Sequence, residues 1–250
     1  MEQQKELTIL YQDEEILIVD KPPGMLVHRN AWDPHAPTCV NSLAGKLQQL
    51  VYNIHRLDRG TSGVLVLALS PESAKTVADA FRDRLVSKRY LAVVRGHLDA
   101  PRTVDTPIRK KNGKAFHAVS HVTPVASTVV PEPVGPYEEA WFSLLEIDLE
   151  TGRRHQARRH LNYIAHPVIG DKQHGDNRNN RFFAERFGVR ELLLRAVSLE
   201  FPHPRTSAPV TAFAGLPGWW RELLRAADLH PPEEFLREPS VGIGKGVPRE

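Results

Sequence analysis

The nonapeptide His55–Gly63 and the apolar run Val64–Leu69 that follows it constrain the fold more than any other stretch. A short apolar run entered from a compact polar loop is typical of a buried β-strand. Two glycines in the loop allow tight backbone geometry there. The loop also sets Asp58 between Arg56 and Arg59, and neighbouring arginines favour the ionised form of a carboxyl group. The stretch therefore predicts a buried strand with an ionised aspartate at its entrance, which fits either a structural ion pair or a reactive group.

The composition places the chain among globular proteins. It has 250 residues, of which 41% are hydrophobic, so it can bury a core as one large domain or two small ones. No apolar run approaches the roughly 20 residues that cross a bilayer, and the polar N-terminus lacks the apolar core of a signal peptide. Cys39 is the only cysteine, which excludes an internal disulfide and a cysteine-cluster zinc site. These features predict a cytoplasmic protein.

Positive charge is modest overall but concentrated in one region. The formal net charge is +3, and between residues 153 and 195 ten lysines and arginines stand against four aspartates and glutamates. Nine of the ten are arginines, whose planar guanidinium groups suit phosphate. A surface that binds polyanions and an ordinary solvated face both fit this cluster.

Hydrophobic periodicity and turn signals divide the chain into short strands and a few helices. Strands that neighbour each other in sequence favour an α+β fold with a mixed, largely antiparallel sheet flanked by helices. We expect one domain over residues 1–229, an exposed proline-rich insertion over 125–137, and a poorly ordered tail over 230–250. The predicted helices cover residues 40–50, 70–85, 153–165 and 216–227. The predicted strands cover 7–11, 16–20, 64–69, 87–96, 141–149, 192–201 and 209–213, with short strands at 103–104 and 118–122 joined by loops. Residues 171–181 are predicted as a long polar loop.

Competing catalytic patterns fail on their spacing. The sequence contains neither a G-x-x-x-x-G-K-[ST] phosphate loop nor a dinucleotide-binding G-x-G-x-x-G after a strand. His155 and His160 lie five residues apart, which is wrong for two metal ligands on one helix face, and no acidic cluster completes a site. Ser62 lacks the G-x-S-x-G setting of a hydrolase nucleophile. Asp58 therefore remains the candidate reactive group, and we expect no metal.

Five motifs in a fixed order resemble those of one enzyme family, the RluA-type pseudouridine synthases. The resemblance spans roughly Ile9 to Phe213. The motifs are Lys21–Gly24, His55–Gly63, Lys88–Tyr90 before an apolar strand, Thr151–Arg158 and His166–Asp171.

The resemblance implies a pseudouridine synthase catalytic fold that converts uridine in RNA to pseudouridine with no cofactor. Asp58 would act at the nucleotide by attack on C1′, addition to the base or removal of the C2′ proton, and each route needs an ionised carboxylate in a dry pocket. Arg158 is expected to pair with Asp58, and Tyr90 to lie against the target base. Arg56 is expected to enter the base stack as the target flips out. His55 and Thr61 are expected to hold the loop by hydrogen bonds.

Within the family, the closest resemblance is to enzymes that modify tRNA at uridine 65 of the T-stem. It implies no N-terminal S4-type RNA-binding domain and no obligate protein partner. A synthase acting on ribosomal RNA, or on both RNAs, is the alternative, followed by an RNA-binding or folding protein without turnover. Five residues are candidate RNA contacts, although each could equally be a solvated loop residue: His28, Arg29, His174, Asn180 and Arg181.

Three positions depart from the usual pattern of the family. Ala157 stands where an isoleucine or leucine is common, Gly60 is small at a variable position, and Arg195 replaces a common histidine. None of these changes removes a proposed catalytic group.

Overall fold

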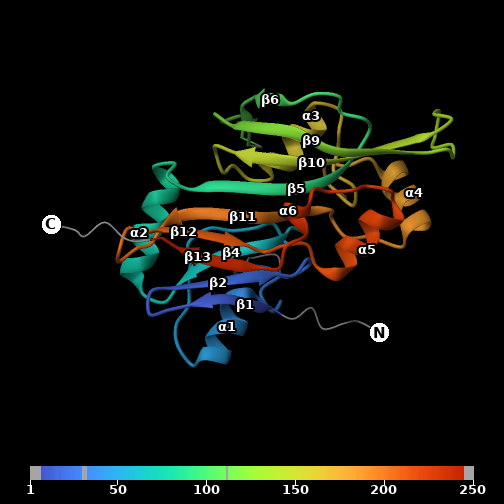
Figure 1. The fold of residues 1–250 in the computed structure, drawn as a ribbon. Coiled ribbons are helices and arrows are strands. Elements are labelled where there is room, and N and C mark those ends of the chain that lie inside the picture. Colours follow the sequence, from blue (N-terminus) through green and yellow to red (C-terminus); the bar gives the residue numbers. More distant parts are fainter. Residues whose placement is uncertain (1–6, 30–32, 111, 245–250) are drawn as a thin grey trace. The chain divides into compact units, whose positions relative to one another are not determined.

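The computed structural model describes residues 7–29, 33–110 and 112–244 (Figure 1). The chain forms two compact units, and each is assembled from separated stretches of sequence. Unit 1 contains residues 1–88, 196–214 and 238–250, and unit 2 contains residues 89–195 and 215–237. Residues 1–229, which we expected to form one domain, are therefore shared between the two units.

Unit 1 is built on strands that surround the predicted buried strand, β4. Along the sheet, β2 pairs with β1 and β4, and β11 follows β4; β12 then pairs with β11, and β13 with β12. Every residue of β4 is buried, which explains the apolar run. The strands are β1 (Thr8–Gln12), β2 (Ile16–Lys21), β3 (Tyr52–Asn53), β4 (Ser62–Ala68), β11 (Leu194–Pro202), β12 (Pro209–Phe213) and β13 (Ser240–Ile243).

The helices of unit 1 begin at clear capping signals. In α1 (Cys39–Leu47), the N-cap Thr38 accepts a hydrogen bond from the backbone of Asn41. In α2 (Pro71–Arg82), the N-cap Ser70 accepts from the backbone of Ser73, and proline occupies the first position. Both predicted helices, over residues 40–50 and 70–85, are confirmed.

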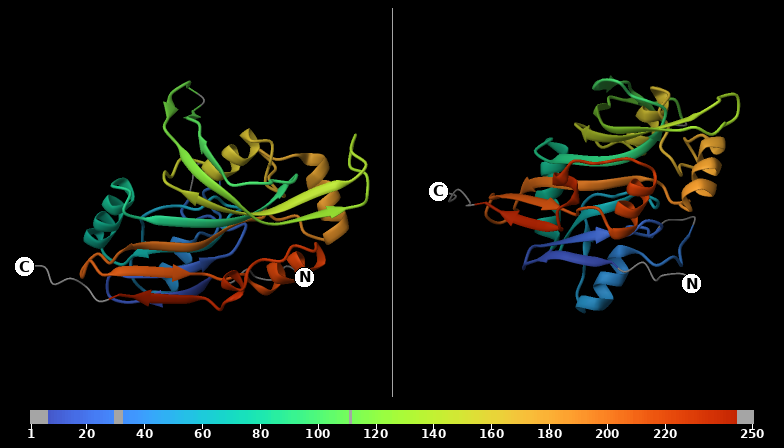
Figure 2. Two further views of the ribbon diagram at one scale, coloured as in Figure 1. Left: turned by 45° about the horizontal axis from the view of Figure 1, so that its top comes forward. Right: turned by 45° about the vertical axis from the view of Figure 1, so that its right-hand side comes forward.

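Unit 2 carries antiparallel strands in the order β5 (Ser87–Arg95), β10 (Ala140–Leu149), β9 (Val119–Val130) and β6 (Arg102–Asp105). The chain passes from unit 1 to unit 2 within β5 and back within β11. Figure 2 shows β9 and β10 as a long ribbon, with an arm of residues 106–110 and 112–118 (green) that extends from it. The arm contains the short hairpin of β7 (Ile108–Arg109) and β8 (Ala115–Phe116).

Residues 125–130 of the proline-rich insertion are the end of β9, and residues 131–137 lie outside the named strands. β9 continues to Val130, and its register against β10 shifts between Leu144 and Leu145. The shift places Pro124 beside a β-bulge, where the missing backbone N–H of a proline is tolerated.

Two segments that were predicted to be irregular contain helix or strand. The predicted polar loop contains the start of α4 (Asn177–Phe187), whose N-cap Asp176 accepts from the backbone N–H groups of Arg178 and Asn179. The predicted disordered tail contains α6 (Glu233–Leu236), with Phe235 buried, and β13, which pairs along the edge of β12. Residues 245–250 lie outside the described chain.

The remaining helices are α3 (Gln156–Tyr163) and α5 (Gly218–Ala226). α3 begins three residues later than predicted because its N-cap, His155, adopts a left-handed conformation with φ 55°. The α+β class with a mixed, largely antiparallel sheet is confirmed. Among the described residues, no helix is long and apolar enough to cross a membrane.

Candidate active site

A tight turn presents Asp58 at the entrance to β4. The Thr61 N–H donates to the Asp58 carbonyl oxygen at 3.1 Å, which closes the turn. Leu57 and Thr61 are buried on either side, whereas Asp58 is partly exposed and Arg56 is exposed. The turn therefore holds the Asp58 backbone while its neighbour Arg56 faces solvent.

Gly63 lets the strand after this turn approach β11 closely. Its φ is +108°, and a Cβ atom there would overlap the backbone of Ala196. Glycine is therefore required at the end of the T-S-G segment, because only glycine combines this positive φ with such close contact to β11.

His55 supports β4 from beside the turn. Its Nε2 accepts a hydrogen bond from the Val66 N–H at 3.1 Å, and its ring stacks on Phe81 of α2 with centroids 4.6 Å apart. Burial is the main cause that lowers the pKa of His55 to about 3, and the positive charge of the nearby Lys88 ammonium lowers it further. The ring is therefore neutral at physiological pH, as an acceptor from a backbone N–H must be.

The K-P-P-G segment is fastened to the same turn by a buried lysine. The Lys21 ammonium is fully buried and donates to the carbonyl oxygens of Pro22, Met25 and Arg59 at 2.9, 2.9 and 3.3 Å. The Gly24 N–H donates to the Arg59 carbonyl at 2.7 Å. These bonds join two motifs that lie 35 residues apart in sequence.

Arg59 has a role that the sequence did not indicate. Its Nε donates to the Gly24 carbonyl at 3.0 Å, and its Nη1 pairs with Asp33 at 3.1 Å. Arg59 therefore braces the K-P-P-G segment on the outside of the turn.

His28 and Arg29 follow this segment. With the Asn41 amide oriented so that its oxygen faces Arg29, Arg29 donates to it from Nε and Nη2 at 3.0 and 2.9 Å. Among the described residues, the Nδ1 atom of His28 is buried without a hydrogen-bond partner.

In unit 2, Tyr90 lies on β5 opposite Ile147 of β10. It is half-buried and packs against a cluster of buried residues that includes Leu161 and Leu194. The preceding Arg89 pairs with Glu146 at 3.3 Å.

Arg158, on α3, forms a buried two-pronged ion pair with Asp171. Its Nε and Nη2 atoms donate to Oδ2 and Oδ1 of Asp171, both at 2.7 Å. The side chains are 10% and 0% exposed, so this pair is shielded from solvent. Such fork geometry is specific to arginine and fixes the guanidinium plane.

The loop around Asp171 is itself held by backbone contacts. Oδ1 of Asp171 also accepts the N–H groups of Gln173 and His174 at 2.9 and 3.0 Å. Although burial opposes ionisation, the bonds from Arg158 and these N–H groups lower the pKa of Asp171. Asp171 is the functional candidate that sequence reasoning missed; its place in H-P-V-I-G-D was the available signal.

Asn180 pins the same loop from α4. Its side chain accepts from the Gly170 N–H at 2.8 Å and donates to the Asp171 carbonyl at 3.0 Å. The structure gives this predicted RNA contact a supporting task, because both ends of its amide bind backbone.

His174 lies against His155, with Nδ1 of His155 2.9 Å from Nε2 of His174. Arg181 is exposed on α4. Arg195, the departure from the family pattern, is buried and donates from Nε to the Gly215 carbonyl at 2.7 Å. Arg195 therefore serves the interior of unit 2 and does not face solvent.

The predicted site residues fall into two groups. Asp58 belongs to unit 1 and Tyr90 and Arg158 to unit 2, so the expected pairing of Asp58 with Arg158 stays a prediction. The remaining candidates of unit 1 are His28, Arg29, His55, Arg56 and Thr61. Within the described ranges, no cluster of three or more histidine, cysteine, aspartate or glutamate side chains could hold a metal.

Comparisons with known proteins agree with these motifs. Residues 15–163 match the RNA pseudouridylate synthase family. The chain is 40% identical to tRNA pseudouridine synthase C of Vibrio cholerae over 230 residues, covering 87% of this chain and 94% of that protein. It is 39% identical to the protein of that name from Haemophilus influenzae, covering 87% and 96%. The solved structure of human RNA Pseudouridylate Synthase Domain Containing 4 superposes with a TM-score of 0.70 at 27% identity, covering 90% and 94%. The chain belongs to the RluA-type RNA pseudouridylate synthase family.

Proposed function

We propose that this protein isomerises a specific uridine of tRNA to pseudouridine in the cytoplasm, at position 65 of the T-stem. The choice of tRNA is supported by about 40% identity to two enzymes named tRNA pseudouridine synthase C, over nearly their full lengths. The position rests on the sequence resemblance described above.

The reaction is an isomerisation, so the uridine neither gains nor loses atoms. The C1′–N1 bond breaks, the uracil turns while held, and C5 bonds to C1′; N1 then carries the proton that C5 loses. Asp58 acts at the nucleotide through its carboxylate. The hydrogen bond from the Thr61 N–H holds the Asp58 backbone in the turn. Tyr90 lies against the base, where stacking contributes roughly 1–3 kcal/mol, and its phenol assists proton transfer.

Arg158 orients the Asp58 side chain, and Asp171 fixes the Arg158 guanidinium plane. Arg56, which is exposed beside the turn, fills the gap in the base stack when the target nucleotide flips out. His28, Arg29, His174 and Arg181 contact RNA.

The test compares wild type with Asp58→Asn on unmodified tRNA and ribosomal RNA, with pseudouridine mapped by carbodiimide adducts and primer extension. We expect one stop, at position 65 of tRNA, with wild type only. Because asparagine keeps the size of the side chain but not its charge, the variant should bind tRNA and lose turnover. Modification of ribosomal RNA alone would overturn the tRNA assignment, and no modification of any RNA would overturn the activity.

A further inference from the structure

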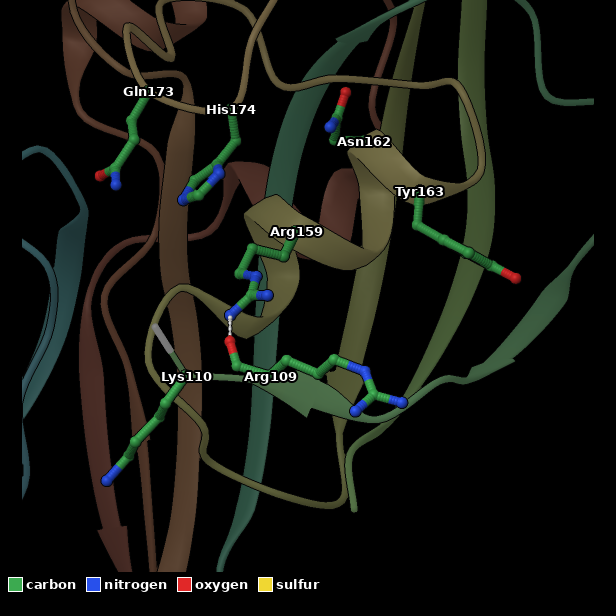
Figure 3. Close-up of a pocket in the computed structure, with 7 residues that line it drawn as sticks. All are labelled: Arg109, Lys110, Arg159, Asn162, Tyr163, Gln173 and His174. Atoms are coloured by element: carbon green, nitrogen blue, oxygen red, sulfur yellow. Dashed lines mark hydrogen bonds between the residues drawn. The ribbon is translucent and has the colours of Figure 1, made fainter. Parts of the chain in front are cut away.

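A cleft of about 530 Å³ opens on unit 2 at a place that no proposed catalytic residue lines (Figure 3). Its walls are the β7–β8 hairpin, helix α3 and the loop that follows Asp171. The hairpin supplies Arg109 and Lys110, the helix supplies Arg159 and Tyr163, and the loop supplies His174. None of the seven lining residues is acidic, so the cleft concentrates positive charge.

A hydrogen bond joins helix α3 to the hairpin. Arg159 donates from Nη1 to the Arg109 carbonyl at 3.0 Å. Figure 3 shows the Arg109 and Lys110 side chains extending to opposite sides of this bond. Both side chains are exposed, and within the described chain neither forms an ion pair with a carboxylate.

Aromatic stacking extends the positive surface along the hairpin. The Phe116 ring lies under the Lys110 and Lys114 ammonium groups, at 4.8 and 5.3 Å from its centroid, and the Arg153 guanidinium lies at 5.7 Å. In contacts of this kind the ring face attracts the cation electrostatically. The cleft therefore continues into a row of cations.

The shape favours a polymer with repeated negative charges over a small anion. Small-ligand sites enclose most of their ligand, whereas this cleft is open and bordered by Tyr163, which is 67% exposed. Arginine forks match phosphate oxygens in pairs, and an exposed tyrosine ring offers a stacking face.

We propose that this cleft, lined by Arg109, Lys110, Arg159 and His174, binds the phosphodiester backbone of the substrate RNA away from the target uridine. The proposal rests on the proposed function for the identity of the RNA. His174 links the cleft to the catalytic residues, because its N–H donates to the Asp171 carboxylate that holds Arg158. An RNA backbone bound in the cleft would therefore contact the loop that positions Arg158 on helix α3.

The test measures binding of a fluorescent unmodified tRNA transcript as a function of salt. Phosphate contacts release counterions, so each lost contact makes the slope of log affinity against log salt shallower by about 0.9. The double variant Arg109→Gln/Lys110→Gln should weaken binding about tenfold or more near physiological salt and make the slope shallower by about two. The loss should be equal for a transcript with cytidine at the target position, because phosphate contacts carry no sequence information.

The matched control is Lys46→Gln/Lys75→Gln, which removes the same charge from exposed positions on α1 and α2. Equal losses in the two double variants would overturn the proposal, as would an unchanged slope. In turnover, the cleft variant should raise KM with kcat retained at saturating tRNA, whereas a fall in kcat alone would also contradict it. If wild type binds tRNA through the cleft but leaves it unmodified, the proposed function fails and the backbone site stands.

Discussion

At the residue scale, two buried charged groups organise the neighbourhood of the motifs. Lys21 binds three backbone carbonyl oxygens in unit 1, and Asp171 binds Arg158 and two backbone N–H groups in unit 2. Burial of a charge is costly unless hydrogen bonds replace water, and both groups meet that requirement. Lys21 therefore holds the turn that follows Asp58, and Asp171 holds the Arg158 side chain.

Removing the charge of Asp171 tests this arrangement. Asp171→Asn leaves Arg158 buried without its carboxylate, so the free energy of unfolding should fall by about 3–5 kcal/mol in urea titrations. Turnover of tRNA should fall at least about 100-fold, because the guanidinium loses its fixed plane.

The double variant Arg158→Met/Asp171→Leu serves as the control. Replacing both partners by apolar groups of similar size should restore part of the stability without restoring turnover. No charge is left unpaired, but the N–H groups of Gln173 and His174 lose their acceptor. Full stability of Asp171→Asn would contradict the assignment.

His55 makes stability depend on pH in a defined direction. Its pKa is lowered to about 3 in the folded protein, so the unfolded chain binds a proton first as the pH falls below about 6.5. The contribution is fully present above that pH and is lost as the pH falls, at about 1.4 kcal/mol per pH unit for one proton.

The measurement is the free energy of unfolding between about pH 7.5 and 5.5, a window above the ordinary pKa values of carboxyl groups. Burial raises the pKa values of Glu146 and Asp148, and both groups are present in the wild type and in the variant. His55→Gln keeps an acceptor for the Val66 N–H but removes the titrating group, so its curve should be flatter than that of wild type. Parallel curves would show that His55 titrates alike in both states. His160 and His166 have pKa values lowered by burial and contribute with the same sign in both proteins.

At the scale of elements, local signals predicted some segments and tertiary packing produced others. α2 followed from Ser70 and Pro71 because capping acts within one turn. α4 was missed because it is rich in asparagine and arginine, and only the packing of Phe183 reveals its apolar face. β13 was missed because a strand of four residues is stable only beside a partner, here β12.

The late strand β13 should contribute to unit 1 through Val241, which packs against the buried cluster that contains Phe201 and Val210. Val241→Asp places a charge against that cluster and should lower the free energy of unfolding by about 1–3 kcal/mol. Ser240→Asp, at an exposed neighbouring position, should change it by less than about 0.5 kcal/mol. Equal effects in chemical denaturation would mean that β13 adds no packing energy.

At the scale of the whole molecule, the two units are interleaved along the chain. Unit 1 draws β11 and β12 from more than 100 residues beyond its first segment, and its core contains residues from both parts, including Ile18, Val66 and Phe201. Neither unit 1 nor unit 2 is a continuous fragment.

A fragment of residues 1–88 should therefore remain unfolded. It lacks β11 and β12, which supply Leu199, Phe201, Val210 and Ala212 to the core, and a sheet without that face buries too little apolar surface. Circular dichroism and proteolysis of the fragment, compared with the full chain, measure this. A cooperative unfolding transition of the fragment would contradict it.

The sequence by itself determined the family and with it the class of reaction, because the motifs and their order can be recognised without the fold. Only the tertiary structure decided which partners their residues take within each unit. Arg59 meets Gly24 and Asp33, Arg158 meets Asp171, and Asn180 holds the Asp171 loop. The physical reason is range. Capping, turn and strand signals act over a few residues, whereas an ion pair or a bridging amide depends on where the folded backbone brings distant side chains.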